Sequence, residues 1–445
     1  MPKNPVTELK IQLAEDTVVD ICQKLIQIDT SNFGDDSGPG ERQAAEYVSE
    51  LLSDVGLEVE SYEPKSRRTN LVTRITGSDP SLPALVLHGH LDVVPALETQ
   101  WKFPAFAGVI EDGVIWGRGA VDMKGMNAMI LSVIRELLQS GYQPKRDLVL
   151  AFFADEEAGG VVGAQSLVSS HPQFFEGASE AISEVGGYSV ELNGRRAYLL
   201  QTAEKGIAWL RLLAQGKAGH GSQITSENVV TELSGALWRI GQYQWPTQII
   251  PTVDKLLRGI SELTALPYDA QNPETVSQLI DALGSTKKFV GATLQNTTNP
   301  TAINSGFKVN VIPENGSAMV DVRFLPGQRS QVLQTLQELA GPRIVIDPMI
   351  VEEAIEAPFS GNLVDAMVNS LQKHDPDAVV LPYALSAGTD NKALARLGIK
   401  GYGFAPLQLP NDLDFPALFH GVNERVPVAS LKFGAKVLRD LLLQV

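Results

Sequence analysis

Apolar residues in the first half of the chain follow two alternating patterns. One set recurs every three or four residues, which predicts amphipathic helices near residues 15–28, 41–55 and 124–139. Continuous apolar runs of strand length accompany these helices, at residues 70–75, 84–89 and 148–154. Because strands that alternate with helices favour an α/β fold, we expect a mixed, mostly parallel sheet with helices on both faces.

The middle of the chain has a different pattern. Half-buried strands are expected at residues 206–214, 316–324 and 343–351, and helices near 226–242, 274–284 and 330–340. Ser330 is the expected N-cap of the last of these helices. We therefore expect an inserted α+β domain over residues 204–354. Residues 1–203 and 355–445, which end in a helix from about 429 to 443, would form one discontinuous domain around it.

Composition narrows the class of protein. A chain of 445 residues is too long to fold around one compact core of usual size, so two or three domains are expected. The net charge of −16 argues against nucleic acid or an anionic membrane as the main partner. No apolar stretch has transmembrane length and residues 1–10 contain no signal core, so we expect a cytoplasmic location. The single cysteine, Cys22, lies in an apolar helical pattern and is expected to be buried, without a disulfide or a four-cysteine zinc site.

Candidate chemistry begins where the apolar run at 84–89 ends. His90 follows this run directly, and Asp92 comes two residues later. Ligands of open α/β sheets gather beyond the carboxyl ends of parallel strands. A neutral imidazole is a good zinc ligand, and a nearby carboxylate can orient it. On spacing alone, a structural histidine that is hydrogen-bonded at a turn explains the pattern equally well.

Acidic residues follow two further segments of the first half. Asp122 lies in a glycine-rich connection, residues 117–125, which has neither phosphate-loop nor dinucleotide spacing. A helix N-cap would explain Asp122 about as well as a ligand would. Glu156 and Glu157 follow the run at 148–154, where two adjacent carboxylates repel each other unless a cation neutralises them. One could bind metal while the other acts as a general base. A solvated acidic loop is the alternative, and the buried-looking strand before it disfavours that interpretation.

Two isolated residues complete the set. Glu184 precedes two glycines, and His420 lies in a loop near the C-terminus, and each alone is a weak signal. Together the five candidate ligands supply two imidazoles and three carboxylates: His90, Asp122, Glu157, Glu184 and His420. This set suits two zinc-like ions that share one bridging carboxylate, with cobalt or manganese also acceptable. An open position on each ion would activate water and polarise a substrate carbonyl.

These segments, in this order, resemble the di-zinc peptidase family that includes carboxypeptidase G, the aminoacylases, succinyl-diaminopimelate desuccinylase, carnosinase and yeast carboxypeptidase S. The matching segments are residues 88–95, 117–125 and 155–160, the Glu184 loop, and residues 219–222 and 420–424. The carboxypeptidase S-like branch is most similar, through residues 183–187 and 201–206. The resemblance implies a zinc-binding catalytic domain formed by residues 1–203 and 355–445. It also implies that residues 204–354 are a lid, which dimerises in many members.

The resemblance also assigns the metal ligands. His90 and Glu184 would bind one zinc ion, Glu157 and His420 would bind the other, and Asp122 would bridge them. A Glu at position 184, where many dipeptidase relatives have Asp, favours the acylase and carboxypeptidase side.

Catalytic roles are implied for three further residues. Glu156 would be the general base, which takes a proton from water and gives it to the leaving amine. Asp92 would hold His90, and a cis peptide bond would follow Asp122. His220 would stabilise the developing oxyanion from the partner subunit, and an ordinary loop histidine is the alternative.

Four residues are expected to bind substrate. Asn310 and Arg323 match positions that grip a substrate carboxylate in relatives, although Arg323 would also suit a salt bridge to Asp321. Gly388 and Thr389 match a turn that supplies backbone contacts. After this turn the chain has Asn-Lys where relatives often have Ala-Arg, which leaves the local carboxylate contact open.

The resemblance therefore predicts hydrolysis of an amide bond beside a free carboxylate. A small peptide is the first expected substrate, and an N-acyl-amino acid is the alternative, with a homodimer through the lid as the expected assembly. A non-catalytic binding protein on the same fold is a third possibility, because a fold alone does not determine function. Retention of every ligand and of Glu156 disfavours it.

Overall fold

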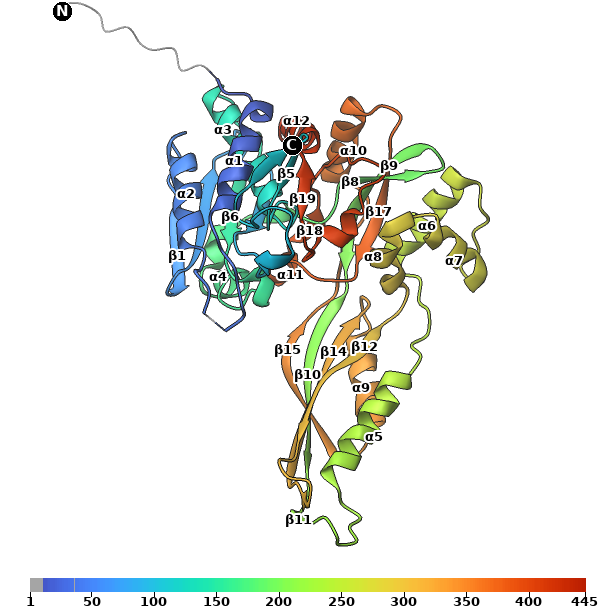
Figure 1. The fold of residues 1–445 in the computed structure, drawn as a ribbon. Coiled ribbons are helices and arrows are strands. Elements are labelled where there is room, and N and C mark those ends of the chain that lie inside the picture. The colour runs from blue at the N-terminus through green and yellow to red at the C-terminus, as the bar shows by residue number, and fades with distance from the viewer. Residues whose placement is uncertain (1–10, 36) are drawn as a thin grey trace, which may run out of the picture.

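A ten-stranded mixed sheet organises the larger part of the chain in this computed structural model, which describes residues 11–35 and 37–445 (Figure 1). The strand order is β1-β2-β6-β3-β7-β18-β9-β16, and β17 and β8 also pair with β9. The bounds are β1 Glu60–Lys65, β2 Arg68–Ile75, β3 Ala84–His90, β6 Leu148–Phe153, β7 Ala178–Ser183, β8 Tyr188–Leu192, β9 Arg195–Glu204, β16 Ile355–Glu356, β17 Val379–Leu385 and β18 Lys400–Gly403. The pairs β3–β6, β3–β7, β7–β18 and β9–β17 are parallel, and the predicted mixed sheet is confirmed.

Helices cover both faces of this sheet because its central strands are apolar on both sides. Leu85 and Leu87 of β3 belong to one core, whereas Val86 belongs to the other. The first core includes α1 Ala14–Gln27, α2 Arg42–Ser53, α3 Lys124–Gln139, α10 Asn362–His374 and α12 Val428–Leu442. The second includes α4 Ala164–Ser170 and α11 Asn391–Ala395. Cys22 of α1 is fully buried and free, as predicted.

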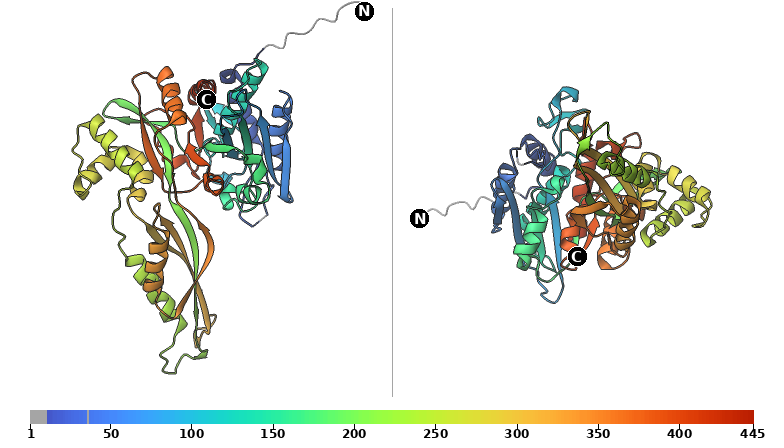
Figure 2. Two further views of the ribbon diagram at one scale, coloured as in Figure 1. Left: turned by 180° about the vertical axis from the view of Figure 1, so that it is seen from behind. Right: turned by 90° about the horizontal axis from the view of Figure 1, so that it is seen from below.

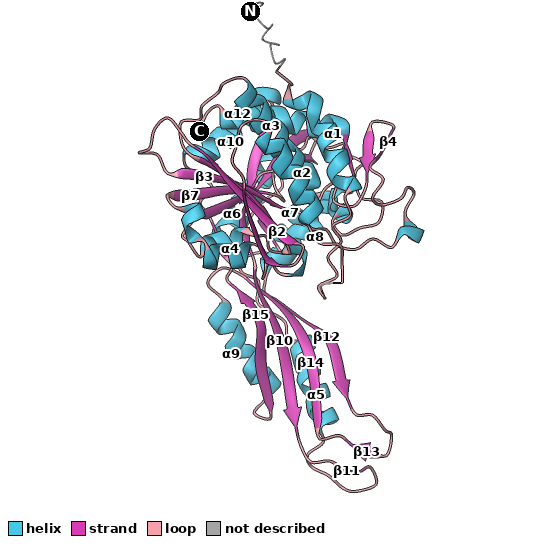
Figure 3. Ribbon diagram, turned by 90° about the vertical axis from the view of Figure 1, so that its left-hand side faces the viewer, coloured by secondary structure: helices cyan, strands magenta, loops and turns pink. Residues whose placement is uncertain are grey.

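A second sheet, four-stranded and antiparallel, forms an arm that extends away from the large sheet (Figure 1, Figure 2). Its strand order is β12-β14-β10-β15, with bounds β10 Gly206–Gln215, β12 Thr297–Ser305, β14 Asn315–Phe324 and β15 Ile344–Glu352. The helices α5 Val229–Gln242 and α9 Arg329–Ala340 pack against one face of this sheet (Figure 3). Two short strands, β11 Gly219–His220 and β13 Val311–Ile312, pair at the far end of the arm.

The helix α9 begins at Arg329 with Gln328 as its N-cap, so the prediction that Ser330 caps this helix is wrong. Gly327 has a φ of 76° and completes a turn in which the Gln328 N–H donates to the Leu325 carbonyl at 3.0 Å. The chain therefore enters the helix directly from this turn, and Ser330 lies inside the first helical turn.

Three helices within the range 204–354 belong to the core of the large sheet and not to the core of the arm. They are α6 Pro251–Thr264, α7 Pro273–Asp281 and α8 Lys287–Gly291. Leu256 of α6 and Val290 of α8 belong to the same core as Leu381 of β17. Packing therefore groups residues 251–291 with the large sheet, although the predicted inserted domain includes them.

A small sheet of three strands, in the order β19-β5-β4, is not paired with either larger sheet. Its strands are β4 Val109–Glu111, β5 Val114–Trp116 and β19 Arg425–Pro427. Among the described residues, no helix is both long enough and apolar enough to cross a membrane. Residues 1–10, where we expected no signal core, lie outside the described part of the chain.

Candidate active site

Three neighbouring parallel strands bring polar residues to one edge of the large sheet. The strand β3 ends at His90, between β6 and β7. Glu156 and Glu157 follow the end of β6, and Glu184 follows the end of β7 directly. Because the carboxyl ends of parallel strands meet at one edge, these residues converge there, as the sequence indicated for His90.

Asp122 lies between two histidines. Its Oδ1 is 3.1 Å from His90 Nε2, and its Oδ2 is 3.4 Å from His420 Nε2. His90 Nε2 is also 3.6 Å from Glu184 Oε1, and His420 Nε2 is 3.0 Å from Glu157 Oε2. The peptide bond after Asp122 is cis, as expected. The structure thus brings all five candidate ligands together, and below we call these five residues the metal cluster.

The donor set of the metal cluster fits divalent cations. Burial raises the pKa of Glu157 to about 7 and the pKa of Glu184 to about 8, and the nearby Asp122 carboxylate adds to both shifts. Glu157 Oε1 and Glu184 Oε2 are buried and have no hydrogen-bond partner among the described residues. Hydrogen bonds with Asp122 and Glu157 raise the pKa of His420 to about 10. Carboxylates that are buried together and lack donors are costly unless a cation neutralises them.

Glu156 lies beside the metal cluster. One of its carboxylate oxygens is within 4.8 Å of ligand atoms of both His90 and Glu184. Burial raises the pKa of Glu156 well above its usual range. A carboxyl group with a raised pKa suits proton transfer near neutral pH.

Asp92 joins two strand ends of the site. Its Oδ1 accepts a hydrogen bond from the backbone N–H of Glu156, and its Oδ2 accepts one from Glu157, both at 3.1 Å. His90 Nδ1 is 2.9 Å from the backbone carbonyl of Asp92 and 3.5 Å from Oδ1 of its carboxylate. The backbone carbonyl is therefore the nearer partner of His90, and the carboxylate of Asp92 mainly holds the Glu156–Glu157 loop.

Glu424 is a buried residue that the sequence did not single out, although it lies in the segment that contains His420. Its carboxylate accepts hydrogen bonds from the backbone N–H groups of Gly119, Val121 and Asp122 at 2.9, 2.7 and 3.0 Å. It also pairs with Arg118 at 2.8 Å. Glu424 thereby fixes the loop that presents Asp122. An acid in the same loop as a candidate ligand was the only signal in the sequence.

A cleft of about 210 Å³ opens beside the metal cluster. It is lined by Glu156, Glu157 and His420 and by Trp209 and Arg323 of the arm. The cleft therefore contains catalytic candidates from the large sheet together with residues of the arm.

Gly388 and Thr389 also line the cleft. The Thr389 backbone N–H and hydroxyl donate to the Glu204 carboxylate at 3.0 and 2.7 Å, which holds this turn against the end of β9. Arg323 pairs with Asp321 through Nε and Nη2, at 2.6 and 3.0 Å, so the salt bridge weighed from the sequence is present.

His220 and Asn310 lie far from the metal cluster, at the end of the arm that carries β11 and β13 (Figure 3). The Gly221 N–H donates to the Asn310 carbonyl at 2.9 Å, and His220 Nδ1 is 2.8 Å from Ser222 Oγ. One chain does not bring these two residues to the cleft, and their expected roles from a partner subunit stay predictions.

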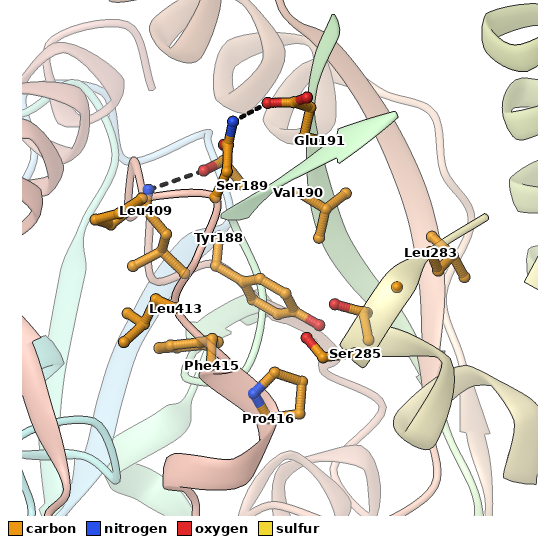
Figure 4. A pocket seen from close by; sticks show the side chains of 14 residues that line it. Tyr188, Ser189, Val190, Glu191, Leu283, Ser285, Leu409, Leu413, Phe415 and Pro416 are labelled. Carbon is orange, nitrogen blue, oxygen red and sulfur yellow. Dashed lines mark hydrogen bonds between the residues drawn. The ribbon is translucent and has the colours of Figure 1, made fainter. Parts of the chain in front are cut away.

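A separate cavity of about 110 Å³ lies next to the segment that leads to His420 (Figure 4). Tyr188 points its ring into this cavity and packs against Phe415 with ring centroids 4.9 Å apart. Phe415 in turn packs edge-on against Phe419 at 5.3 Å, and Phe419 immediately precedes His420. The Leu409 N–H donates to Ser189 Oγ at 2.8 Å on another wall. The cavity is therefore lined by Tyr188 and Phe415, two of the aromatic residues that support the loop of His420.

A family model described as peptidase family M20/M25/M40 matches residues 86–444, which include the metal cluster and the arm. The chain belongs to this family. The resemblance found in the sequence is therefore confirmed, and this M20 protein is a hydrolase of the metallopeptidase class.

Named relatives of this M20 protein fall into several activity groups. It is 29% identical over 390 residues to "Probable carboxypeptidase S-like 2" of Dictyostelium discoideum, covering 82% of this chain and 72% of that protein. It is 28% identical over 453 residues to "N-fatty-acyl-amino acid synthase/hydrolase PM20D1" of Mus musculus, covering 97% and 89%. The solved M20 metallo-carboxypeptidase Sso-CP2 of Sulfolobus solfataricus superposes with a TM-score of 0.73 at 18% identity, covering 96% and 98%. The last similarity shows a shared fold.

Proposed function

We propose that this M20 protein is a di-zinc hydrolase that cleaves the amide bond next to a free carboxylate in small peptides. The observation that carries the proposal is the position of Asp122 between His90 and His420, with Glu156 beside them in the same cleft. Two zinc ions held by the metal cluster would supply Lewis acidity that polarises the substrate carbonyl and acidifies water, and cobalt or manganese would suit the same donors.

The residues of the chain would carry out the proton transfers and the positioning. Glu156 accepts a proton as the water oxygen adds to the carbonyl carbon, and it donates this proton to the amine as the C–N bond breaks. Asp92 keeps Glu156 in place through the backbone hydrogen bond described above. Arg323 would hold the free carboxylate of the substrate in the cleft, beside the turn at Gly388 that Thr389 fixes through its hydrogen bonds to Glu204.

We also propose that the protein is a homodimer that forms through the arm. The structure places His220 and Asn310 at the far end of the arm. A second copy would have to supply them to the cleft, where His220 of the partner subunit would stabilise the developing oxyanion. The cytoplasmic location expected from the sequence stays a prediction.

An aminoacylase or N-acyl-amino-acid hydrolase is the second candidate function. It is supported by two relatives that cover most of this chain, the mouse protein above and "Aminoacylase-1" of Sus scrofa, which is 24% identical over 419 residues. Both candidate reactions break an amide bond beside a free carboxylate, so the same site would serve either.

The test is amine release from a matched substrate panel, with zinc and with a chelator. The panel pairs dipeptides with N-acetyl and long-chain N-acyl amino acids that share one C-terminal residue, and metal analysis of the purified protein gives the stoichiometry. Chelator-sensitive cleavage of the dipeptides, with two metal ions per chain, is the expected result. Cleavage of only the acylated set would establish the second candidate. Activity that survives full metal removal would contradict both.

A further inference from the structure

The arm has one open face. Along β10 and β14, Leu210 and Val320 point to the side covered by α5 and α9 and belong to the core of the arm. Trp209 and Met319 alternate with them and therefore lie on the opposite face of the sheet, which no helix of the arm covers (Figure 3). In Figure 1 this open face lies on the side of the arm away from α5 and α9.

An apolar groove of about 260 Å³ lies on this open face. Its lining residues are Trp209, Leu210, Thr301, Met319, Val320, Asp321 and Met349, so that it is mostly apolar. The charge of Asp321 is compensated by its pair with Arg323, so the groove is close to neutral.

The groove adjoins the cleft of the metal cluster. Trp209 lines both the groove and the cleft. The positions of the other lining residues along β14 show how far the groove lies from Arg323. Arg323, which lines the cleft, lies two residues from Asp321 and four from Met319 along β14. Since a strand rises about 3.4 Å per residue, the groove begins roughly 7 Å from Arg323 and continues along the strand.

We propose that this groove binds the side chain of the substrate residue that carries the free carboxylate, and that it selects large apolar side chains. The inference rests on the proposed function, in which Arg323 holds that carboxylate. The Cα of this residue bears both groups, so a carboxylate at Arg323 places the side chain next to Trp209. Methionine side chains adapt to different apolar shapes, and a neighbouring tryptophan adds a flat apolar wall, which suits leucine, methionine and phenylalanine.

The acyl or N-terminal part of the substrate lies on the other side of the scissile bond. With the carboxylate at Arg323, this part extends from the metal cluster away from the arm groove. We therefore expect the groove to select the side chain of the carboxylate-bearing residue. The length of the acyl chain should not affect binding in the groove.

The experiment measures kcat/KM for two substrate series. One series is the dipeptides alanyl-alanine, alanyl-leucine, alanyl-methionine, alanyl-phenylalanine and alanyl-arginine, and the other is alanine with N-acyl chains of increasing length. The variant is Met349→Glu, because this side chain is 49% exposed and tolerates a charge without a folding cost to the core. The matched control is Val345→Glu, on the same strand and 63% exposed, beyond the ion pair of Arg211 with Asp347.

The wild-type protein is expected to prefer leucine, methionine and phenylalanine over alanine by about tenfold or more. Met349→Glu should reduce this ratio by about tenfold and raise the relative rate for alanyl-arginine, since a carboxylate in the groove attracts the guanidinium. Val345→Glu should leave the ratio as in the wild type. A conservative variant, Trp209→Phe, should change the order of preference among the three apolar side chains.

Three results would overturn the proposal. A change confined to the acyl-length series would mean that the groove binds the acyl chain. An equal loss for all substrates together with a smaller particle in solution would mean that a second copy covers the groove. Cleavage without any side-chain preference in the wild type would also refute it. Failure to cleave any amide in either series would instead refute the proposed function itself.

Discussion

Asn32 donates a hydrogen bond from Nδ2 to Asp92 Oδ2 at 2.8 Å, and this contact joins the loop after α1 to the centre of the site. The same Nδ2 is 3.2 Å from Asp155 Oδ1, and Arg68 donates to Asn32 Oδ1 at 2.9 Å, which fixes the orientation of the amide. All of these side chains are buried. Because Asp92 holds the backbone of residues 156–157, Asn32 acts on the site through Asp92 and is a positioning residue.

Asn32→Asp should impair the site without a change in side-chain size. The new carboxylate cannot donate to Asp92, and it adds a negative charge beside Asp92 and Asp155. Loss of such an outer contact typically costs about 10–100-fold in metal affinity or activity. We expect that loss in zinc titrations and in kcat. Asn272→Asp is the control, since Asn272 caps α7 at the surface and Asp caps equally well. Wild-type metal affinity and kcat in Asn32→Asp would contradict the positioning role.

Glu156→Gln should retain metal and lose turnover. Glutamine keeps the shape of the side chain but cannot accept the proton of the attacking water. General-base catalysis typically contributes about 10²–10⁴-fold, so kcat should fall by that factor. The zinc content should equal that of the wild type. Glu353→Gln, an exposed residue paired with Arg329 on the arm, is the matched control and should keep both. A Glu156→Gln protein that turns over at the wild-type rate would rule out Glu156 as the base.

The convergence of part of the metal cluster could be predicted from local signals, whereas Glu184 and His420 are weak signals on their own. His90 and Glu157 each follow an apolar run, and parallel strands align such ends at one edge of the sheet. Asn32 and Arg68 carry no such signal. Asn32 is a polar residue after a helix, and its partner Asp92 lies 60 residues further along the chain, so only the folded chain reveals the contact.

The packing of residues 251–291 shows a second limit of the sequence pattern. Periodicity indicates that one side of α6 is buried, which the structure bears out for Val253, Leu256 and Ile260. It does not indicate which sheet covers that side. The segment lies between two strands of the arm along the chain, yet its apolar side packs with β17 of the large sheet.

Asp147 should make stability depend on pH in the acid range. A backbone hydrogen bond from Gly77 at 2.8 Å, with the pair to Arg74 at 2.7 Å, lowers the pKa of Asp147 below its usual 3.8. Because folding lowers this pKa, the ionised carboxylate stabilises the folded state at pH values above 3.8, the pKa in the unfolded chain. This contribution is lost as the pH falls through the lower pKa of the folded state.

Asp147→Asn should therefore lower the free energy of unfolding by about 1 kcal/mol at pH 7, allowing for partial exposure. The difference from the wild type should shrink as the pH falls from 3.8 through the lowered pKa of folded Asp147, because the aspartate becomes protonated over this range and is then uncharged like the asparagine. Urea unfolding at pH 7, 5 and 3 measures it. Asp20→Asn, on the exposed side of α1, should show no such trend. A difference that grows towards low pH would have the wrong sign for this explanation.

Phe415 should couple stability to metal binding through the His420 loop. His420 has a φ of 57°, a left-handed conformation that is unusual for a residue other than glycine and that its surroundings must stabilise. Phe415 is 5% exposed and packs between Tyr188 and Phe419, the residue before His420. Removal of a buried phenylalanine ring typically costs about 3–5 kcal/mol.

Phe415→Ala should therefore lower stability by about that amount, and it should also weaken one of the two proposed metal sites more than the other. The site that includes His420 would lose an oriented ligand, whereas His90 is held by β3 and Asp92. Zinc titration at a temperature where the variant is folded should resolve one weakened and one unchanged site. Phe175→Ala, a buried ring in the second core, is the control for loss of packing alone. Equal weakening of both sites, or the same effect in the control, would show that Phe415 supports the fold and not the position of His420.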